Sequence, residues 1–365
     1  MKTNDKSNKN RKVPMQGNIA LCEGAIAGGC DAYYGYPITP QNEVASYMSK
    51  KMPESGRIFL QSESELSAIN MVFGSALAGK RAMTSSSSPG ISLMQETISY
   101  LCGCELPCVI ANIQRGGPGL GNIAGSQADY FQSVKGGGHG DYRMITLAPA
   151  GVQEMYDFAL VSFKLAEKYR NPVMILSDGY TGQMMEPVEL KSYDSVAGDS
   201  AAGQEKYLPD WVLDGCKGRE PRKIRSLIME EGALEKHNYK LARKYQNIRE
   251  NEVLVDLDRM DDAEVAIVAF GIAARVAKSA VDIARDAGIR AGIIRPITLW
   301  PFPEKEIFSI TQKIKKILVA EMNMGQMVED VRLASGGLVP VKFIGRPGGG
   351  IFTPEEIYEH LKKII

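Results

Sequence analysis

The chain has 365 residues, with 43 lysines and arginines balanced by 43 aspartates and glutamates. This length predicts two domains joined by a connector. The balanced charge gives no net field that would favour nucleic acid or an anionic membrane surface, so the expected partner is a small molecule or another protein. The polar and basic start of the chain has no apolar segment behind it, and no apolar run approaches the about 18 to 20 residues of a membrane helix. A cytoplasmic protein with a flexible tail is therefore expected.

The six cysteines are sparse for a chain of this size, which favours free thiols in a reducing compartment. Cys102, Cys104 and Cys108 lie close together in sequence and raise the question of a metal site. Their spacing, C-x-C-x3-C, matches neither a ferredoxin cluster nor a zinc-type pair, so buried thiols are favoured. The three histidines are far apart in sequence and form no metal or catalytic-triad pattern. No metal site is expected on this chain.

The segment from Asn18 to Ser177 alternates short apolar runs with longer segments of helical period. This pattern is typical of a parallel sheet covered by helices on both faces. Six parallel strands are expected, at residues 32–36, 57–61, 81–85, 108–112, 144–148 and 172–177, with helices including 65–78, 91–101 and 153–169. Together they predict one α/β domain.

Between residues 187 and 262 this alternation stops. A turn-rich polar segment is followed by a charged stretch, 224–249, with apolar residues at roughly helical spacing, which predicts a connector with one long surface helix. From Val265 the alternation resumes, with strands expected at 265–269, 291–294, 317–320 and 341–344. The predicted organisation is a tail at 1–16, a first α/β domain at 17–190, a connector at 191–262 and a second, smaller α/β domain at 263–365.

The loops after the strands are where chemistry is sought, because open parallel sheets bind ligands outside the carboxyl ends of their strands. The first such loop is Tyr36-Pro37-Ile38-Thr39-Pro40. Pro40 suits the first turn of the following helix, which would leave Thr39 near the N-cap with its hydroxyl directed out of the sheet edge. A simple helix start is the competing interpretation.

The second loop reads QSESE at residues 61–65. Ser62 and Glu65 have the spacing of a capping box, so Glu65 could serve only as a helix cap. The functional interpretation is a partly desolvated carboxylate at the end of a buried sheet, where a raised pKa would let it share a proton with a ring nitrogen. Periodicity does not separate the two.

The third and fourth loops read SSSSPG at 85–90 and QRGGPGLGNIA at 114–124. The serine run could bind an anion or simply form a turn. Arg115, at a strand end and followed by glycines, suits a bidentate grip on a carboxylate or phosphate, and a surface arginine in a flexible loop is the alternative. Gly119, Gly121 and Ala124 superficially fit a dinucleotide-binding pattern, which is discounted because these glycines do not follow the strand directly.

Taken in order, these loops resemble the alpha-type subunit of 2-oxoacid:ferredoxin oxidoreductases. The matching motifs are YPITP at 36–40, QSESE at 61–65, the serine run at 85–90, QRGGP at 114–118, RPITLWPFP at 295–303 and EMNMGQ at 321–326. The resemblance covers nearly the whole chain after the tail. It implies a pyrimidine-type thiamine-diphosphate-binding domain followed by a transketolase C-terminal-like domain. A non-catalytic structural subunit that has kept this fold is the alternative.

The resemblance also implies roles for individual residues. Glu65 matches the glutamate that bonds N1' of the aminopyrimidine, and it is chosen over Glu63 by its spacing to Gly74. Sharing its proton with N1' would favour the cofactor tautomer that attacks the oxoacid carbonyl. Thr39 and Arg115 match the pair that contacts the substrate carboxylate. The residues expected at the cofactor are Tyr36, Pro37, Ile38, Thr39, Glu65 and Arg115.

Features that the chain lacks predict its partners. The Gly-Asp-Gly motif that holds Mg²⁺ and the diphosphate has no match, Ser177-Asp178-Gly179 being the nearest run, and no iron–sulfur cysteine run is present. The resemblance implies a beta-type subunit with the diphosphate and Mg²⁺ site, a gamma-type subunit and a small ferredoxin-like iron–sulfur subunit. Coenzyme A would be the co-substrate and ferredoxin the electron acceptor. The chain alone should be inactive.

The substrate is expected to be a branched-chain oxoacid such as 3-methyl-2-oxobutanoate. Residues 116–138, with SQADY at 126–130 and KGGGHGD at 135–141, are most similar to that branch of the family. The alternative is 2-oxoglutarate, whose distal carboxylate would need a second cation near the site. Lys135 or Arg143 could serve if either faces the crevice.

Overall fold

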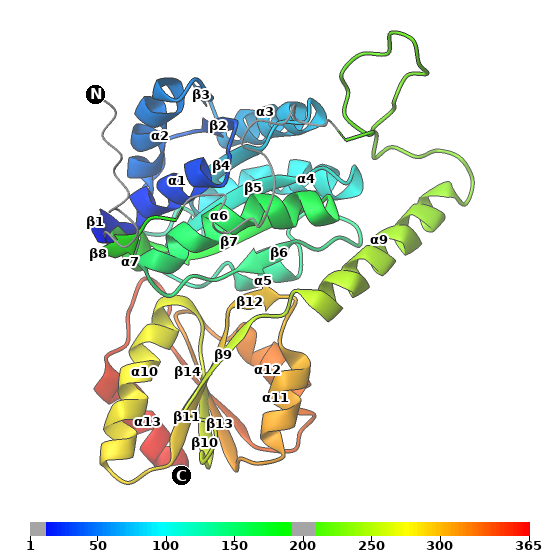
Figure 1. Cartoon of the computed structure of the whole chain (residues 1–365). Coiled ribbons are helices and arrows are strands. Elements are labelled where there is room, and N and C mark those ends of the chain that lie inside the picture. Colours follow the sequence, from blue (N-terminus) through cyan, green and yellow to red (C-terminus); the bar gives the residue numbers. More distant parts are fainter. Residues whose placement is uncertain (1–11, 192–208) are drawn as a thin grey trace, which may run out of the picture.

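The computed structural model describes residues 12–191 and 209–365, which contain two large sheets flanked by helices (Figure 1). The larger sheet has the strand order β12-β6-β7-β5-β4-β2-β3. Its strands are β12 (Thr298–Trp300), β6 (Ile145–Leu147), β7 (Pro172–Asp178), β5 (Cys108–Gln114), β4 (Ala82–Ser86), β2 (Ala32–Gly35) and β3 (Ile58–Gln61). All pairings in it are parallel except that of β12 with β6. The six parallel strands expected from the sequence are therefore present.

Helices cover both faces of this sheet, because successive residues of each strand point to opposite sides. Val109, Ala111 and Ile113 of β5 belong to a core shared with α1 (Gly17–Ala27), α2 (Asn42–Glu54) and α6 (Val152–Tyr169). Ile110 packs instead in the core that includes α3 (Glu65–Leu77) and α4 (Ser88–Gly103). The remaining short helices of this region are α5 (Tyr130–Val134) and α7 (Gly179–Gln183).

The smaller sheet has the strand order β14-β13-β10-β11-β9. Its strands are β14 (Val341–Gly345), β13 (Lys316–Glu321), β10 (Val265–Val268), β11 (Ala291–Pro296) and β9 (Val255–Asp258). Its helices are α10 (Gly271–Asp286), α11 (Glu304–Thr311), α12 (Met327–Ser335) and α13 (Pro354–Ile364). Helices α10 and α13 pack together on one face, and α11 and α12 on the other. The α/β fold class predicted for both parts of the chain is confirmed.

Four strands were not predicted, β1 (Lys12–Gln16), β8 (Met185–Glu189), β9 and β12, and each is antiparallel to its partner. β1 pairs with β8, so the last residues of the expected tail are ordered in a strand, whereas residues 1–11 lie outside the described residues. β9 forms an edge of the smaller sheet within the expected connector. β12 leaves the second domain to extend the larger sheet. These strands were missed because the βα alternation detects only parallel units.

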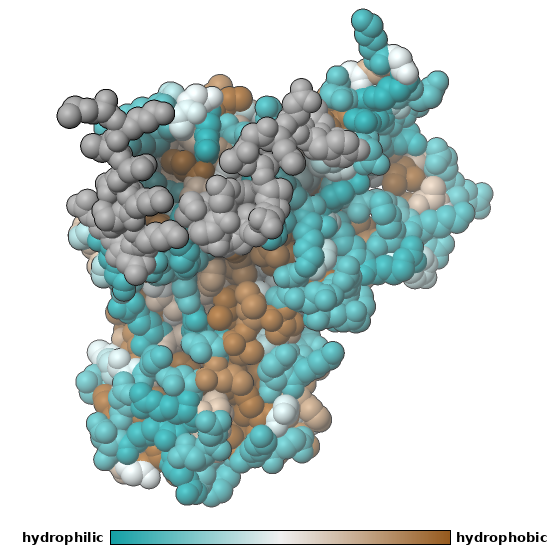
Figure 2. Space-filling model, viewed as in Figure 1, coloured by the Kyte–Doolittle hydropathy of each residue, from teal (hydrophilic) through white to brown (hydrophobic). Residues whose placement is uncertain are grey.

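Apolar surface gathers on the smaller domain around its edge strand. In the view of Figure 2 it runs down the middle of that domain, between flanks that are mostly hydrophilic. Leu254, just before β9, is 47% exposed, and Leu257, within β9, is 45% exposed.

Membrane-spanning helices are absent from the part of the chain that the structure describes, because none of its helices combines the length and the apolar character that a span needs.

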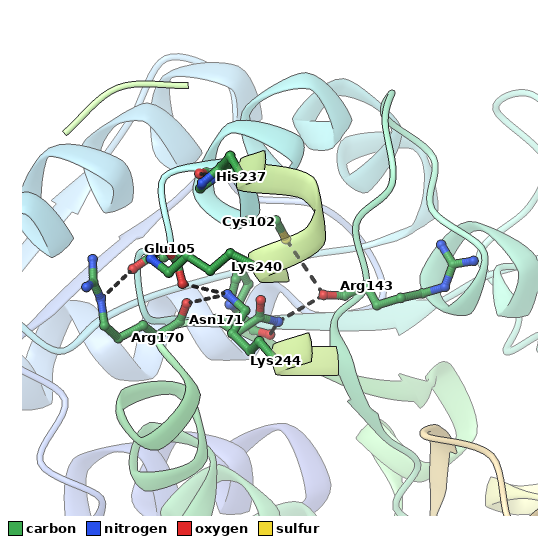
Figure 3. A network of polar contacts seen from close by, with 10 residues as sticks. Cys102, Glu105, Arg143, Arg170, Asn171, His237, Lys240 and Lys244 are labelled. Carbon is green, nitrogen blue, oxygen red and sulfur yellow. Dashed lines mark hydrogen bonds and ion pairs between the residues drawn. The ribbon is translucent and has the colours of Figure 1, made fainter. Parts of the chain in front are cut away.

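The connector helix is α9 (Ala233–Asn251), and a partly buried polar network holds it against the first domain (Figure 3). It starts later than the charged stretch suggested, because Gly232 adopts a left-handed conformation with φ of +70°. The carboxylate of Glu105 accepts a hydrogen bond from Lys240 and lies 3.5 Å from Lys244. His237 contacts the carbonyl oxygen of Gly103 at 2.8 Å. The connector is thus attached to the first domain through residues 237–244 of its helix.

All six cysteines are free, and only Cys216 is exposed. Burial raises the pKa of Cys102 to about 12 and raises that of Cys104 as well. Within residues 12–191 and 209–365, no three histidine, cysteine or carboxylate side chains come together as a metal site. The three neighbouring cysteines therefore lie in the core as thiols.

The two domains are joined at Gln127, which follows β5 in the chain. Its backbone N–H and side-chain Oε1 form reciprocal hydrogen bonds with the backbone of Met322, at 3.1 and 3.0 Å. Its Nε2 donates to the carbonyl of Phe270 at 2.8 Å, and its own carbonyl accepts from Asn323 at 2.8 Å. Every polar group of Gln127 thus bonds to the second domain, which fixes the loops of the two sheets relative to one another.

Asp178 lies buried at the end of β7, where the two domains meet. Its carboxylate accepts hydrogen bonds from the backbone of Tyr180 and Thr181, at 2.9 and 3.0 Å, and from the backbone of Ile272 in the second domain. Burial outweighs these donors and raises the pKa of Asp178 to about 6. Protonation of Asp178 therefore stabilises the folded state, and the free energy of unfolding should depend on pH through this group.

Replacing Asp178 with asparagine tests this linkage. A carboxyl whose pKa is about 6 when folded and 3.8 when unfolded stabilises the fold fully below pH 3.8 and loses that contribution as the pH rises to 6. The free energy of unfolding of the wild type, relative to Asp178→Asn, should fall by about 2 kcal/mol between pH 4 and pH 6. Denaturant titrations of both proteins across this range measure it, and a difference independent of pH would contradict the assignment.

Candidate functional site

The carboxyl ends of β2, β3, β4 and β5 meet at one edge of the larger sheet. Gly35 pairs with Gln61 at the ends of β2 and β3, and Ser86 pairs with Asn112 near the ends of β4 and β5. This register brings together the four loops that the sequence analysis selected. The candidate site is this edge of the sheet.

Glu65 is the first residue of α3, and its side chain is buried with 6% exposure. Its carboxylate has no hydrogen-bond or ion-pair partner among the described residues. It packs against Gly90 in the first turn of α4, where a Cβ atom would lie 2.5 Å from Glu65 Oε1. Burying a carboxylate without a donor is costly, so this position suits a ligand that brings a donor of its own. A protonated ring nitrogen is such a donor.

The capping-box interpretation of Glu65 is wrong. The N-cap of α3 is Ser64, whose hydroxyl accepts from the backbone of Ser67 at 3.2 Å, whereas Ser62 lies outside the helix. Glu65 is therefore at the first helical position, and a capping box needs its glutamate at the third. Exposed Glu63 accepts hydrogen bonds from Ser64 and Ser67, which lower its pKa. The hydrogen bonds at the start of α3 thus involve the carboxylate of Glu63 and not that of Glu65.

Arg115 directly follows β5 and is 7% exposed. Its Nη1 donates to the carbonyl of Thr39 at 3.0 Å, and its Nη2 donates to the carbonyl of Leu120 at 2.9 Å. The buried Nε has no partner among the described residues. A guanidinium has five N–H donors, so the side chain is fixed in place yet retains donors for an anion. The structure thus brings Thr39 and Arg115 together.

The YPITP loop connects β2 to α2 at the same edge. Tyr36 and Pro37 are exposed, Ile38 and Thr39 are half-buried, and Pro40 is buried. The expectation that Pro40 starts the helix, with Thr39 near its N-cap, is wrong. Helix α2 begins at Asn42 with Gln41 as its N-cap, so the loop is longer than expected, and Thr39 Oγ1 accepts from Asn42 Nδ2 at 3.2 Å.

Asn112 and Asp129, which lie next to Ser88 near Arg115, were given no role from the sequence. Asp129 accepts a hydrogen bond from Asn112 at 2.9 Å and another from Ser88, and burial raises its pKa. Ser88 also accepts from the backbone N–H of Arg115 at 3.0 Å. Three buried polar atoms near these strand ends have no partner among the described residues: Thr84 Oγ1, Ser87 Oγ and Asn112 Oδ1. The serine run was the only signal that the sequence analysis used for this cluster of polar groups.

The Arg115 loop, residues 115–125, closes on itself. The backbone N–H of Gly116 donates to Ala124 and that of Asn122 donates to Gly116, both at 2.9 Å. Gly121 has φ of +60° and lies so close to the Gly116 carbonyl that a Cβ atom would be 1.7 Å from its oxygen. No helix starts within this loop, whereas a dinucleotide-binding glycine loop opens directly into one. The dinucleotide interpretation therefore has no structural support.

Both of the cations considered for a distal carboxylate have partners within the protein. Lys135 forms an ion pair with Asp330 of the second domain. Arg143 donates to the carbonyls of Tyr142 and Lys135, at 2.8 and 3.3 Å. It also precedes β6, so it lies at the amino edge of the parallel sheet, opposite Arg115.

Two protein-family models match the chain. Residues 23–255 match the model described as pyruvate flavodoxin/ferredoxin oxidoreductase, thiamine diphosphate-binding. Residues 263–357 match pyruvate:ferredoxin oxidoreductase core domain II. The thiamine-diphosphate-binding model covers all four loops of the candidate site.

Curated relatives align over nearly the whole chain. The ketoisovalerate oxidoreductase subunit VorB of Methanothermobacter thermautotrophicus is 46% identical, covering 96% of this chain and 97% of that relative. The 2-oxoglutarate synthase subunit KorA of the same organism is 36% identical, covering 96% of this chain and 98% of that relative. Both are named as subunits of larger enzymes.

Solved structures share the fold. The 2-oxoglutarate:ferredoxin oxidoreductase of Magnetococcus marinus, bound to 2-oxoglutarate, coenzyme A and succinyl-CoA, superposes with a TM-score of 0.87 at 27% identity, covering 97% of this chain and 65% of that chain. A split-gene transketolase, described as an inactive beta4 tetramer, superposes with a TM-score of 0.58 at 15% identity, covering 96% of this chain and 97% of that chain, which supports the transketolase-like fold. The expected family resemblance is confirmed by these matches and by the two family models. This chain belongs to the family of 2-oxoacid:ferredoxin oxidoreductase subunits.

Proposed function

We propose that this subunit holds the aminopyrimidine end of thiamine diphosphate and the carboxylate of a 2-oxoacid during oxidative decarboxylation. The observation that carries the proposal is the buried carboxylate of Glu65, which has no donor among the described residues and lies at the same sheet edge as Arg115. The two groups are complementary in chemistry. The Glu65 carboxylate can accept a hydrogen bond from a ligand, and the unpaired Nε of Arg115 can donate one to an anion.

The residues present fit the cofactor and the substrate. Bound thiamine diphosphate supplies the nucleophilic carbon, and Glu65 would hold the proton at N1' of its aminopyrimidine ring. Arg115 would donate to the substrate carboxylate, and Thr39, next to it, would contact the same group. Tyr36, Pro37 and Ile38 would line the ring. In this arrangement the first α/β domain, expected at 17–190, carries every residue proposed to contact cofactor or substrate.

The remaining parts of the reaction are proposed to lie on partner subunits. The Ser177-Asp178-Gly179 run is unsuited to Mg²⁺, because Asp178 is buried and already accepts from Tyr180, Thr181 and Ile272. We therefore assign Mg²⁺ and the diphosphate to a beta-type subunit. The iron–sulfur clusters would lie on a small ferredoxin-like subunit, with a gamma-type subunit completing the complex, coenzyme A taking the acyl group and ferredoxin taking the electrons.

Exposed apolar side chains near the candidate site support a covering partner. They lie on the loops and helices of the site edge, and they are Tyr36, Leu66, Leu93, Leu120 and Ile123. Leu120 and Ile123 of the Arg115 loop are 80% and 65% exposed. Apolar surface of this kind around a polar site is typical of a protein–protein interface. A partner seated there would also exclude water from Glu65 and Arg115.

Replacing Glu65 with glutamine tests its proposed role. The amide keeps the shape of the side chain but cannot hold a proton at N1', so turnover of the assembled complex should fall by about 100-fold or more. The free energy of unfolding should not fall, because Glu65 bonds to no other described residue and a neutral amide is less costly to bury than a carboxylate. Steady-state kinetics and denaturant titration measure the two quantities. Glu63→Gln is the matched control, and equal turnover in both variants would contradict the proposal.

We further propose a branched-chain 2-oxoacid such as 3-methyl-2-oxobutanoate as the substrate. The ketoisovalerate subunit is 46% identical to this chain, and the 2-oxoglutarate synthase subunit is 36% identical. The engagement of Lys135 by Asp330 also argues against a second cation for a distal carboxylate.

Kinetics with the two oxoacids test this preference. The assembled complex should have a kcat/KM at least about tenfold higher for 3-methyl-2-oxobutanoate than for 2-oxoglutarate, because burying a distal carboxylate without a cation is costly. Both values are measured at the same ferredoxin and coenzyme A concentrations. Equal values, or a preference for 2-oxoglutarate, would overturn the substrate assignment while leaving the role of Glu65 intact.

A further inference from the structure

A glycine-rich loop of the second domain lies against the Arg115 loop. This glycine loop, residues 345–350, follows β14 of the smaller sheet, whereas the Arg115 loop follows β5 of the larger sheet. Asn122 of the Arg115 loop donates from Nδ2 to the carbonyl of Gly348 at 2.8 Å. Tyr180 at the start of α7 donates from its hydroxyl to the carbonyl of Gly349 at 2.6 Å. Two groups that follow strands of the larger sheet thus bind the same loop.

The contact at Gly349 leaves no space for a side chain. Gly349 has φ of +89°, and a Cβ atom there would lie 2.6 Å from the Cβ of Ala124 and 3.2 Å from Oδ1 of Asn122. The closest of these separations is well inside van der Waals contact, so a larger residue would displace the Arg115 loop. Glycine at position 349 is therefore needed for the two loops to meet.

Hydrogen bonds within the Arg115 loop extend this contact to the guanidinium. The backbone N–H of Asn122 donates to Gly116, and its Oδ1 accepts from the backbone of Ala124 at 3.0 Å. Two residues before Asn122, the carbonyl of Leu120 accepts from Arg115 Nη2 at 2.9 Å. One of the two anchors of the guanidinium thus lies on the segment that Gly348 holds through Asn122.

We infer that the glycine loop of the second domain positions Arg115 for the substrate carboxylate, acting through Asn122 and Ala124. This inference rests on the proposed function of Arg115. It makes Asn122 and Gly349 positioning residues, because neither needs to touch the substrate. A bidentate grip on a carboxylate depends on the direction of the guanidinium, so a displaced Leu120 carbonyl would weaken substrate binding more than it would slow later steps.

The variant Gly349→Ala tests the inference in the assembled complex. The added methyl group should push Ala124 away and raise the KM for the 2-oxoacid by about tenfold, with a smaller effect on kcat. Hydrogen exchange at the backbone amides of residues 116–125 should become faster, because the bonds between Gly116, Asn122 and Ala124 are strained. Exchange is measured without substrate, so this readout is independent of turnover.

Gly288→Ala is the matched control. Gly288 lies in the same domain with φ of +83°, close to that of Gly349, but a Cβ atom there would meet nothing within 4 Å. It therefore reproduces the backbone strain without the collision, and its KM should stay within about twofold of the wild type. The double variant Gly349→Ala/Ala124→Gly removes the closest colliding atom and should recover most of the lost affinity.

The outcomes separate the inference from the proposed function. Equal KM values and equal exchange in Gly349→Ala and Gly288→Ala would overturn the inference. If Gly349→Ala fails to assemble, Asn122→Ala removes the hydrogen bond to Gly348 without adding volume, and an unchanged KM in that variant would also overturn it. Arg115→Lys is measured alongside. An unchanged KM in Arg115→Lys would refute the role of Arg115 itself, whereas the exchange data would still show whether the glycine loop holds residues 116–125.

Discussion

The carboxylate of Glu65 is buried against Gly90 at the start of α4 and has no donor among the described residues. Burying a carboxylate without a hydrogen-bond donor destabilises a folded protein, so other interactions must offset this loss of free energy. The strand ends hold the carboxylate there, because α3 begins at Glu65 shortly after β3 ends at Gln61, and α4 begins at Ser88 shortly after β4 ends at Ser86. Any ligand that completes this site must offer a hydrogen-bond donor to a group at the first turn of α3. The aminopyrimidine of thiamine diphosphate meets that requirement.

The second constraint is the guanidinium of Arg115, which is held by two carbonyls and keeps unused donors. Its anchors come from different parts of the chain. Thr39 belongs to the loop after β2, whereas the Leu120 carbonyl lies on a loop that contacts the second domain through Asn122. The second domain contributes no residue of the proposed site, yet its contacts at Gln127 and Gly348 bear on the geometry of the first. In the proposed site, domain packing and substrate recognition would therefore depend on the same short segment, residues 115–127.

Much of this architecture could be predicted from the sequence, because parallel βα units leave a strong alternating signal. That signal is absent for β9 and β12. Both strands are short, and each pairs antiparallel with a strand that is not its neighbour in the chain. The capping-box prediction failed at Glu65 because the spacing of Ser62 and Glu65 does not reveal that Ser64 begins the helix. Asp129 could not be found, since its link to Ser88 depends on contacts between separate loops that no local pattern encodes. The order of the motifs along the chain was enough to locate the site. Which of its side chains lack hydrogen-bond partners became visible only in the three-dimensional structure.

The central claim is that this subunit provides one half of a shared cofactor site, with Glu65 as its contact to the aminopyrimidine ring. A structure of the assembled complex with thiamine diphosphate bound tests it most directly. The account predicts a hydrogen bond of about 2.7 Å between the Glu65 carboxylate and N1', with the diphosphate and Mg²⁺ held by a partner subunit. A cofactor bound with its ring away from Glu65, or held entirely by other subunits, would contradict the account.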